Sequence, residues 1–509
     1  MSSPSYPSGI RRWLIIITVM AAMLMQVLDI TIANVALPHM QAALGATPDS
    51  VAWVLTSYIV MAAIATPITG WLESRMGRRN LFGLAIAGFT LSSAACGLAS
   101  SLTMMVISRA LQGTFGAFIA PLAMSTMLDS SAQEKHPQAM MIFTMGITIG
   151  PIMGPVLGGW LTDNYDWRWV FFINVPIGII ASVAILLLLD KVSLVRQRFD
   201  LFGFALLGLG LASLQLMLDR GTQQDWFDSP EIIIEAGVAI SALWMFIVHI
   251  LTTAKPLLPL ALLRDRNYVL AILFTILIMG IAMSSQALMA PMLQSLMGYD
   301  VMGAGMMMAP RGVGALIAMP LVTMLGRRLD PRILIGFGMV LVVVSQAMMT
   351  GFDLEMGRGP IIHATFIQGL GMGFTFLPLN ILAFSTIAPQ LRTEGAAFYN
   401  LARNIAGSVA ISLMSLLIAR NLQISHNDLG THITSTSIPV IGNTAIAPFG
   451  VPGGTILHMI DAEINRQAMM IAYLDDFWLM KWAALVTLPL ILLMRRAKPR
   501  DDQTPMLIE

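Results

Sequence analysis

Long apolar stretches separated by short polar segments dominate the hydrophobic pattern of this chain. A transmembrane helix needs about 20 consecutive apolar residues, and fourteen stretches come near that length. They cover residues 13–37, 51–72, 81–99, 103–126, 138–160, 168–189, 200–219, 232–253, 268–290, 301–324, 333–351, 360–386, 397–419 and 478–494. They lack the alternation of a transmembrane β-strand, and only helices or closed barrels satisfy backbone hydrogen bonds in lipid. The pattern predicts an all-α integral membrane protein with 14 transmembrane helices.

Composition favours one membrane domain over several soluble domains. Hydrophobic residues make up 56% of the 509 residues and charged residues only 11%, so a water-exposed surface of this composition would not be solvated. The stretch from Trp13 to Leu37 is longer than the roughly 7–15 residues of a cleavable signal core, which predicts a retained first span. The single cysteine, Cys96, excludes an intramolecular disulfide, and no basic tract indicates binding to nucleic acid.

The distribution of Lys and Arg predicts the orientation, because these residues are enriched in cytoplasmic segments. With both termini inside, twenty of the 29 Lys and Arg residues fall in inner segments. Only six fall in outer segments or at outer span ends, and Arg109, Arg311 and Arg403 lie within spans. We therefore predict an inner-membrane protein with cytoplasmic termini at residues 1–12 and 495–509.

A short echo between two inner loops indicates an internal duplication. The segment RMGRRNL at 75–81 is echoed by GRRLDPR at 326–332. This echo predicts two six-helix halves, at residues 13–189 and 268–494, with a two-helix segment at 200–253 between them. Such repeats place a substrate site near the midplane, between the halves.

The longest predicted extramembrane element is a periplasmic loop at 420–477, which is rich in Ser, Thr, Gly and Pro. Within it, apolar residues recur at roughly helical spacing and predict an amphipathic helix. These residues are Ile456, Ile460, Ile464, Ala468 and Ile471. Two interpretations stay open: a cap packed on the bundle or on the membrane surface, and a docking site for a periplasmic partner.

A carboxylate and an arginine occur at matching predicted depths in spans 1 and 4. Asp29 lies about eight residues, or roughly 12 Å, from the outer end of its span, and Arg109 about six residues, or roughly 9 Å. Intramembrane carboxylates commonly mark ion or proton pathways. We expect Arg109 to stabilise ionised Asp29 in one conformation and release it in another. The alternatives are a permanent structural pair, and an Arg109 side chain that extends to the outer interface.

The fifth span carries a glycine every four residues, which makes a flat ridge along one helix face. The ridge consists of Gly146, Gly150, Gly154 and Gly158, with Pro151 and Pro155 beside two of them and Gly159 at its end. A ridge of this kind lets another helix approach closely, and prolines supply bends. The segment is therefore a candidate gate, with plain helix packing as the alternative.

The inner loop after span 2 is rich in glycine and arginine. Its candidate residues are Gly70, Arg75, Gly77, Arg78 and Arg79. The cations either only orient the helices or act as a latch that binds carbonyls or carboxylates at the inner mouth.

These motifs resemble the EmrB/QacA branch of the major facilitator superfamily, the fourteen-spanner drug:proton antiporters. LDITIANVALP at 28–38 resembles the span-1 motif of that branch, and Arg109-x-x-Gln112-Gly113 its span-4 motif. Residues 150–159 resemble its antiporter motif, and residues 309–314 and 400–404 are also similar to the branch. The resemblance covers nearly the whole chain.

The resemblance implies a major facilitator fold with two six-helix pseudo-repeats and two additional central helices. It also implies export of small amphipathic or toxic compounds in exchange for protons, with Asp29 and Arg109 in proton coupling. A periplasmic membrane-fusion adaptor and an outer-membrane channel are the implied partners. One departure matters: the inner-loop motif of the superfamily has an acidic residue where this chain has Ser74, and the neighbouring Glu73 is displaced by about 100° around the helix.

We expect the substrate cavity to include six polar residues within the spans: Gln26, Asn34, Gln112, Arg311, Gln368 and Arg403. Away from the span ends, the only predicted carboxylate is Asp29, against three arginines, which favours neutral or weakly acidic substrates over dications. No cofactor, metal or catalytic residue is expected, because the chain has no GxxxxGK[ST] loop, no HExxH motif and only scattered histidines. An importer, or an exporter of one specific metabolite on the same fold, is the alternative.

Overall fold

The computed structural model describes residues 9–132, 135–190, 199–221, 224–253, 256–326, 328–432 and 454–494. In this part of the chain every regular element is a helix, and 13 helices are long and apolar enough to cross a membrane. A further helix of 29 residues, α7, occupies the fifth predicted span. All fourteen predicted spans are therefore helical, and the all-α membrane fold is confirmed.

The helices form three consecutive groups along the chain. The first group contains α1 (Gly9–Leu44), α2 (Pro48–Val51), α3 (Trp53–Ala65), η1 (Thr66–Ile68), α4 (Thr69–Met76), α5 (Arg78–Gly97), α6 (Leu102–Asp129), α7 (His136–Asn164), α8 (Trp169–Phe172) and α9 (Asn174–Leu188). The second contains α10 (Leu201–Arg220), η3 (Trp226–Asp228), α11 (Pro230–Thr252) and α12 (Leu260–Arg264). The third contains α13 (Arg266–Pro291), η4 (Met292–Leu296), α14 (Val301–Leu325), α15 (Pro331–Met349), α16 (Arg358–Ser385), η5 (Pro389–Leu391), α17 (Arg392–Thr431), α19 (Gly454–Thr487) and η6 (Leu488–Leu493).

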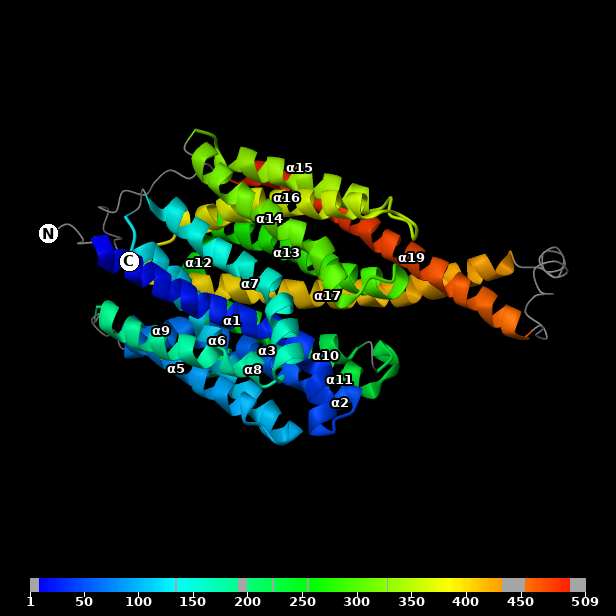
Figure 1. Cartoon of the computed structure of the whole chain (residues 1–509). Coiled ribbons are helices and arrows are strands. Elements are labelled where there is room, and N and C mark those ends of the chain that lie inside the picture. Colours follow the sequence, from blue (N-terminus) through cyan, green and yellow to red (C-terminus); the bar gives the residue numbers. More distant parts are fainter. Residues whose placement is uncertain are drawn as a thin grey trace.

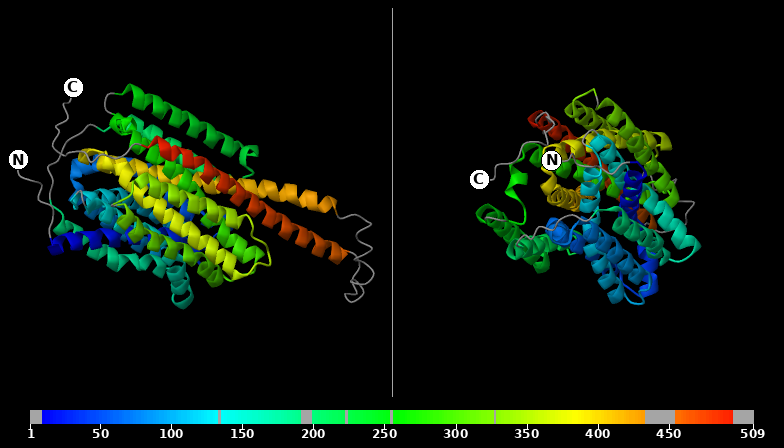
Figure 2. Two further views of the ribbon diagram at one scale, coloured as in Figure 1. Left: turned by 90° about the horizontal axis from the view of Figure 1, so that it is seen from above. Right: turned by 90° about the vertical axis from the view of Figure 1, so that its left-hand side faces the viewer.

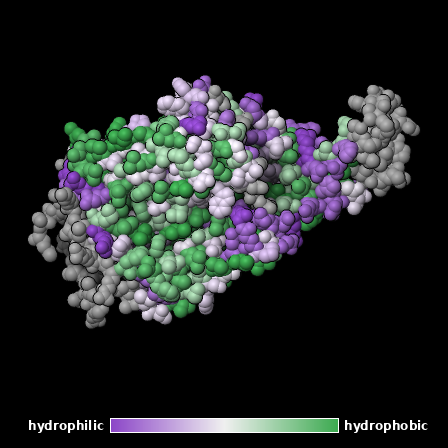
Figure 3. All heavy atoms as spheres, turned by 90° about the horizontal axis from the view of Figure 1, so that it is seen from below, coloured by the Kyte–Doolittle hydropathy of each residue, from purple (hydrophilic) through white to green (hydrophobic). Residues whose placement is uncertain are grey.

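The first and third groups lie side by side as two halves of one elongated bundle (Figure 1). Helix α7 packs against α14 and α16, and α17 packs against α3, η1, α4 and α6, so both helices join the halves. Hydrophobic side chains cover much of the flank of the bundle, as Figure 3 shows. We call the end at which α1 begins the inner end, after the predicted orientation, and the opposite end the outer end.

The two central helices form a hairpin that contacts both halves. Helix α10 packs against α3 of the first half and against α17 of the second half. The Ser412 hydroxyl of α17 donates a hydrogen bond to the Leu218 carbonyl of α10 at 3.0 Å. At the other end of α10, the Asp200 carboxylate caps the helix and accepts a hydrogen bond from the backbone N–H of Leu257. The hairpin therefore connects the two halves rather than standing apart from them.

The segment predicted as the loop 420–477 is largely helical. Helix α17 continues to Thr431, and α19 begins at Gly454, so both extend beyond the outer end of the other helices (Figures 1 and 2). Ile460, Ile464 and Ala468 occupy the more buried face of α19, so the amphipathic helix is confirmed over these positions. Ile471 shares that face by its spacing but is 37% exposed, so the burial of the face does not extend to it. The outer parts of α17 and α19 extend away from the bundle and do not fold over it as a cap. We call these outer parts the projection.

Candidate functional site

A fully buried polar cluster surrounds Asp29 in the first half. Both Asp29 and Arg109 are only 1% exposed, and the Arg109 Nη1 atom lies 2.6 Å from Asp29 Oδ2. The other carboxylate oxygen, Oδ1, accepts hydrogen bonds from the Gln112 amide at 2.8 Å and the Asn174 amide at 2.9 Å. Three helices, α1, α6 and α9, therefore supply one carboxylate and its three donors.

The Arg109 guanidinium is held from several sides. Its Nη1 atom also donates to Gln112 Oε1 at 2.9 Å, and its Nε atom donates to the Val54 carbonyl at 3.0 Å. The Tyr58 ring lies 4.4 Å from the guanidinium carbon, which adds a cation–π contact. Arg109 thus turns towards Asp29 as the matched depths predicted, and the alternative in which it extends to the outer interface is wrong.

Because the Asp29–Arg109 pair is buried, the charge of Asp29 strongly affects the stability of this conformation. A buried ion pair that loses one partner leaves an uncompensated charge, which costs about 3–5 kcal/mol. Protonating Asp29 has the same electrostatic effect, because it removes the negative charge and leaves Arg109 buried. Without the charge of Asp29, Arg109 would keep only its neutral partners, namely the Val54 carbonyl, Gln112 and the Tyr58 ring.

Asn174 is a member of this cluster that the sequence analysis missed. It is 2% exposed at the beginning of α9, and its amide also donates to the Ser93 hydroxyl at 3.0 Å. The available signal was an amide inside the run from Val170 to Leu189, in which Ser182 is the only other polar residue.

The glycine ridge of α7 packs directly against α1. A Cβ atom added at Gly146, Gly150 or Gly154 would collide with the side chains of Met20, Val27 or Thr31, respectively. At Gly158 the Cβ would lie 3.2 Å from Ile32 Cγ2, whereas at Gly159 nothing lies within 4 Å. The four glycines spaced by four residues therefore face α1, and Gly159 does not. The side chains of Pro151 and Pro155 lie outside the described residues.

The ridge and the buried pair share one helix. Thr31, which meets Gly154, is two residues from Asp29 on α1. A change in the position of α1 at Asp29 therefore also changes its packing against α7.

Charged residues at the inner end form a chain that joins the two halves. Arg78 contacts Glu73 at 2.6 Å and Asp129 at 2.7 Å, and Asp129 contacts Arg392 of α17 at 2.5 Å. Glu73 thus has a partner within its own half, despite its displaced position. Because Arg392 belongs to the second half, the chain of ion pairs fits the latch interpretation of the inner loop.

Of the other inner-loop residues, Gly70 also contacts the second half. Gly70 lies against the Glu394 side chain of α17, which an added Cβ would overlap. Gly77 has φ of 78°, a left-handed conformation that favours glycine, and so permits the turn between α4 and α5. Arg75 stacks on Trp71 at 5.4 Å, and Arg79 has a buried Nε atom without a hydrogen-bond partner in the described part of the chain.

The six polar residues expected in one cavity are distributed over separate places. Gln112 belongs to the Asp29 cluster, and the Gln26 amide donates to the Gly116 carbonyl at 2.8 Å. Asn34 is exposed and bonds to its own helix. In the second half, Gln368 donates to Ser285, Arg311 donates to the Ala282 carbonyl at 2.9 Å, and Arg403 has a buried Nε atom without a partner among described residues. A cavity of about 650 Å³ lies between α13, α17 and α19, and none of the six residues lines it.

A second buried carboxylate lies just outside the spans to which the predicted charge imbalance was confined. Asp476 of α19 is 1% exposed, although the sequence placed it just outside span 14. Helix α19 runs without a break from Gly454, which carries Asp476 into contact with the other helices of the second half. The count of one carboxylate against three arginines concerns the predicted spans alone, so the preference for neutral or weakly acidic substrates stays a prediction.

Two helical halves, a two-helix connection between them and a fully buried carboxylate–arginine pair define the class: a multi-pass membrane transporter, not an enzyme. Comparison with known proteins agrees. Residues 19–411 match the Major Facilitator Superfamily, and the chain belongs to that family.

Several curated relatives match almost the whole chain. The fatty acid resistance protein FarB of Neisseria gonorrhoeae is 34% identical over 94% of both chains. The multidrug export protein EmrB of Escherichia coli K12 is 33% identical over 95% of both chains. The probable multidrug resistance protein EmrY of the same strain is 34% identical over 98% of both chains. These similarities confirm the EmrB branch that the motifs indicated.

A solved structure supports the fold independently. The human organic anion transporter MFSD10 aligns with a TM-score of 0.57 over 94% of this chain and 100% of its own, at 13% sequence identity. At that identity the similarity concerns the fold alone.

Proposed function

We propose that this chain is a proton-coupled antiporter that exports small amphipathic or toxic compounds across the inner membrane, with both termini in the cytoplasm. The observation that carries the proposal is the Asp29–Arg109 pair, which is fully buried and joined by a contact of 2.6 Å. The names of FarB, EmrB and EmrY support export of hydrophobic and toxic compounds.

In the proposed cycle, a proton that enters from the outside neutralises Asp29 and weakens its contacts with Arg109, Gln112 and Asn174. Helix α1 then shifts along the glycine ridge of α7, and the inner-end ion pairs between Asp129 and Arg392 separate. Substrate enters from the inside as the proton leaves. The described conformation, with its inner ion pairs formed, corresponds to the state that is closed on the inner side.

The test is proton-driven efflux from vesicles that carry Asp29→Asn. A neutral amide cannot load and release a proton, so transport driven by an imposed pH gradient is expected to fall to background while membrane insertion stays normal. Asp29→Glu should retain partial transport. Asp225→Asn is the matched control, because Asp225 is exposed and has φ of 53°, a conformation that Asn also tolerates. Wild-type transport rates in Asp29→Asn would rule out the assignment.

An importer, or an exporter of one metabolite, would use the same buried pair. The direction of substrate movement under an imposed pH gradient separates importer from antiporter. An importer moves substrate into the compartment that protons enter, whereas an antiporter moves substrate out of that compartment. A panel of unrelated toxic compounds, tested in an efflux-deficient host, separates broad export from export of a single metabolite.

The proposed partner is a periplasmic membrane-fusion adaptor, together with an outer-membrane channel. The projection of α17 and α19 at the outer end supports this proposal, because it carries exposed apolar side chains such as Ile424 and Met459, which are 47% and 61% exposed. A photo-crosslinking residue at Met459 should capture a periplasmic protein, whereas one at the lipid-facing Leu187 should not.

A further inference from the structure

A glutamate of the second half lies inside the inner contact between the two halves. Glu394 belongs to the first turn of α17, two residues after Arg392. Its side chain packs directly on Gly70 of α4, and a Cβ atom added at Gly70 would overlap the Glu394 Cγ and Cδ atoms. The conformation that is closed on the inner side therefore holds this carboxyl group between α17 and α4.

The charges around Glu394 favour a neutral side chain while the halves are in contact. Glu73 follows Gly70 by three residues on the same side of α4, and its negative charge repels an ionised Glu394. Arg78 attracts the carboxylate, but its Nε and Nη1 atoms are engaged by Glu73 at 2.6 Å and by Asp129 at 2.7 Å. Among the described residues, no basic side chain forms an ion pair with Glu394. Partial burial beside a like charge thus stabilises the protonated form of Glu394 in this conformation.

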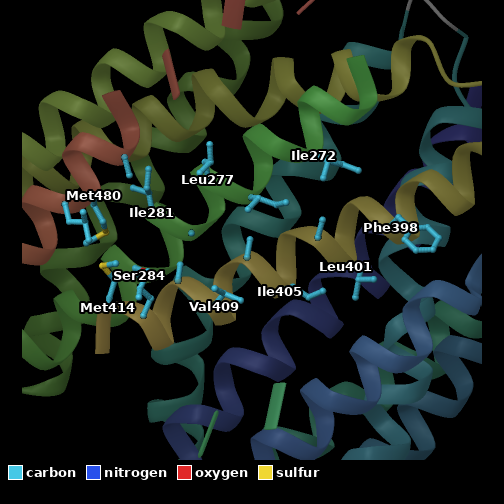
Figure 4. Close-up of a pocket in the computed structure, with 18 of the residues that line it drawn as sticks. Ile272, Leu277, Ile281, Ser284, Phe398, Leu401, Ile405, Val409, Met414 and Met480 are labelled. Carbon is cyan, nitrogen blue, oxygen red and sulfur yellow. The ribbon is translucent and has the colours of Figure 1, made fainter. Parts of the chain in front are cut away.

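The surroundings of α17 indicate the side from which such a proton comes. Phe398, one helical turn further along α17, lines the apolar cavity between α13, α17 and α19, as Figure 4 shows. The helix thus enters apolar surroundings on the outer side of Glu394, whereas Arg392 on the other side lies at the cytoplasmic end in the predicted orientation. A proton on Glu394 therefore exchanges with the cytoplasm rather than with the outside.

Two further ionisable groups lie near this contact. The Tyr268 hydroxyl of α13 donates to the Gly395 carbonyl at 2.7 Å, and a tyrosine keeps its proton at neutral pH. His136 of α7 bonds to the Ser131 carbonyl and lies close enough to Arg392 for their charges to interact. Protonated His136 would add a positive charge beside Arg392, so acidification acting through His136 would loosen the inner contact rather than tighten it.

Opening of the inner end changes the environment of Glu394. When α17 and α4 separate, the carboxyl group leaves Gly70 and Glu73 and meets water, where a glutamate is ionised at neutral pH. The closed form therefore binds one proton more than the open form, and acid favours the closed form. A difference of one bound proton changes the ratio of closed to open molecules by up to about tenfold per pH unit.

We propose that Glu394 is a regulatory proton site, which takes up a proton from the cytoplasm as the inner end closes and returns it as the halves separate. This proton is not transported, so it adds nothing to the exchange that Asp29 drives. It makes opening of the inner end depend on cytoplasmic pH. The inference rests on the proposed antiport for its biological purpose: an acidified cytoplasm would keep the exporter closed on the inner side and so limit further proton entry.

The experiment follows the inner end by the distance between two spin labels, a readout that does not depend on transport. The labels are attached at Asn80 of the first half and Leu329 of the second half, which are both exposed. The full chain is studied in lipid nanodiscs without substrate, with Cys96 replaced by alanine. Asp29→Asn is the background, because it removes the titration of Asp29 and, in the proposed cycle, favours an open inner end.

Acidification of this background is expected to raise the ratio of closed to open molecules by up to about tenfold per pH unit. Adding Glu394→Gln should remove the pH response and leave the inner end closed, because a neutral amide resembles the protonated carboxyl group. Glu394→Asp, which keeps a carboxyl group, should retain the response. Glu355→Gln is the matched control, since Glu355 is exposed, and it should leave the response unchanged.

A second measurement detects the proton itself and does not require Glu394→Gln to fold. Infrared spectra of protein that carries carbon-13-labelled glutamate show a labelled carboxylic acid band at neutral pH only if a glutamate is protonated. The band is expected with Asp29 intact, when the inner end is closed. Glu394→Asp should remove the band, whereas Glu355→Asp should not.

Four results would overturn the proposal. A label distance that does not respond to pH in Asp29→Asn would leave Asp29 as the proton sensor, and an undiminished response after Glu394→Gln is added would assign it to another group. Opening on acidification would point to His136. A carboxylic acid band that survives Glu394→Asp, or is absent from wild type, would show that Glu394 is ionised in the closed form. Neither measurement uses proton-driven efflux, so this site and the antiport function fail separately.

Discussion

Replacing Gly154 by leucine tests whether close contact between α1 and α7 is required for transport. A Cβ atom at this position already overlaps the Thr31 hydroxyl, so a leucine side chain has no space while α1 stays in place. Overpacking of this kind costs about 1–3 kcal/mol. If that cost applies only to the described conformation, the balance between the two transport states shifts roughly 5- to 150-fold.

Gly159→Leu is the matched control on the same helix, because nothing lies within 4 Å of a Cβ atom at Gly159. The assay combines substrate efflux from vesicles with labelling of a cysteine placed at the inner end, in a background where Cys96 is replaced by alanine. We expect Gly154→Leu to lower efflux at least fivefold and to raise inner-end labelling, while Gly159→Leu resembles wild type. Wild-type efflux and labelling in Gly154→Leu, or equal damage in both variants, would refute the reasoning.

Three further predictions concern the inner end, the topology and the central hairpin. Arg392→Gln removes the contact between Asp129 and the second half and should raise inner-end cysteine labelling. Arg264 is exposed, so Arg264→Gln should leave the labelling unchanged. Equal labelling in both variants would contradict the latch. Cysteines at Gly9 and at Met459 should be labelled from opposite sides of the membrane, and labelling of both from one side would contradict the predicted orientation. Asp200→Ala should lower the free energy of unfolding by about 1 kcal/mol through loss of the helix cap. Thermal unfolding in detergent measures this change, and an unchanged unfolding temperature at neutral pH would contradict the role. Burial opposes ionisation of Asp200, but the hydrogen bonds from Gly203, His249 and Leu257 lower its pKa. The stabilisation of the fold by ionised Asp200 is therefore present above about pH 4 and is lost as the pH falls through the lowered pKa of the folded state.

Hydrophobic pattern alone located the helices, because the length of a span is fixed by the thickness of the bilayer. The same pattern predicted that Asp29 and Arg109 lie at one depth in the membrane, because depth follows from the number of residues between a side chain and the end of its span. Spacing of four residues also identified the face of α7 that meets α1. Each of these features depends on the sequence of one helix, or on the membrane depth that residues of two helices share.

Features that depend on how distant segments meet were not predictable in this way. Asp129 and Arg392 are separated by 263 positions, and no periodicity relates them. Asn174 completes the Asp29 cluster only because α9 approaches α1. Asp476 was missed because hydropathy falls in the acidic pair at 475–476, while burial by neighbouring helices keeps α19 continuous there.

The length of α17 gives the transporter a mechanical property. Its 40 residues contain no proline and form one helix of about 60 Å, whose inner end carries the latch residue Arg392 and whose outer end lies beyond the bundle. A rigid rod of that length displaces its far tip by about 1 Å for each degree of tilt. A small rocking of the second half is thus amplified at the tip of α17, where any protein seated on it would register whether the inner side is open or shut.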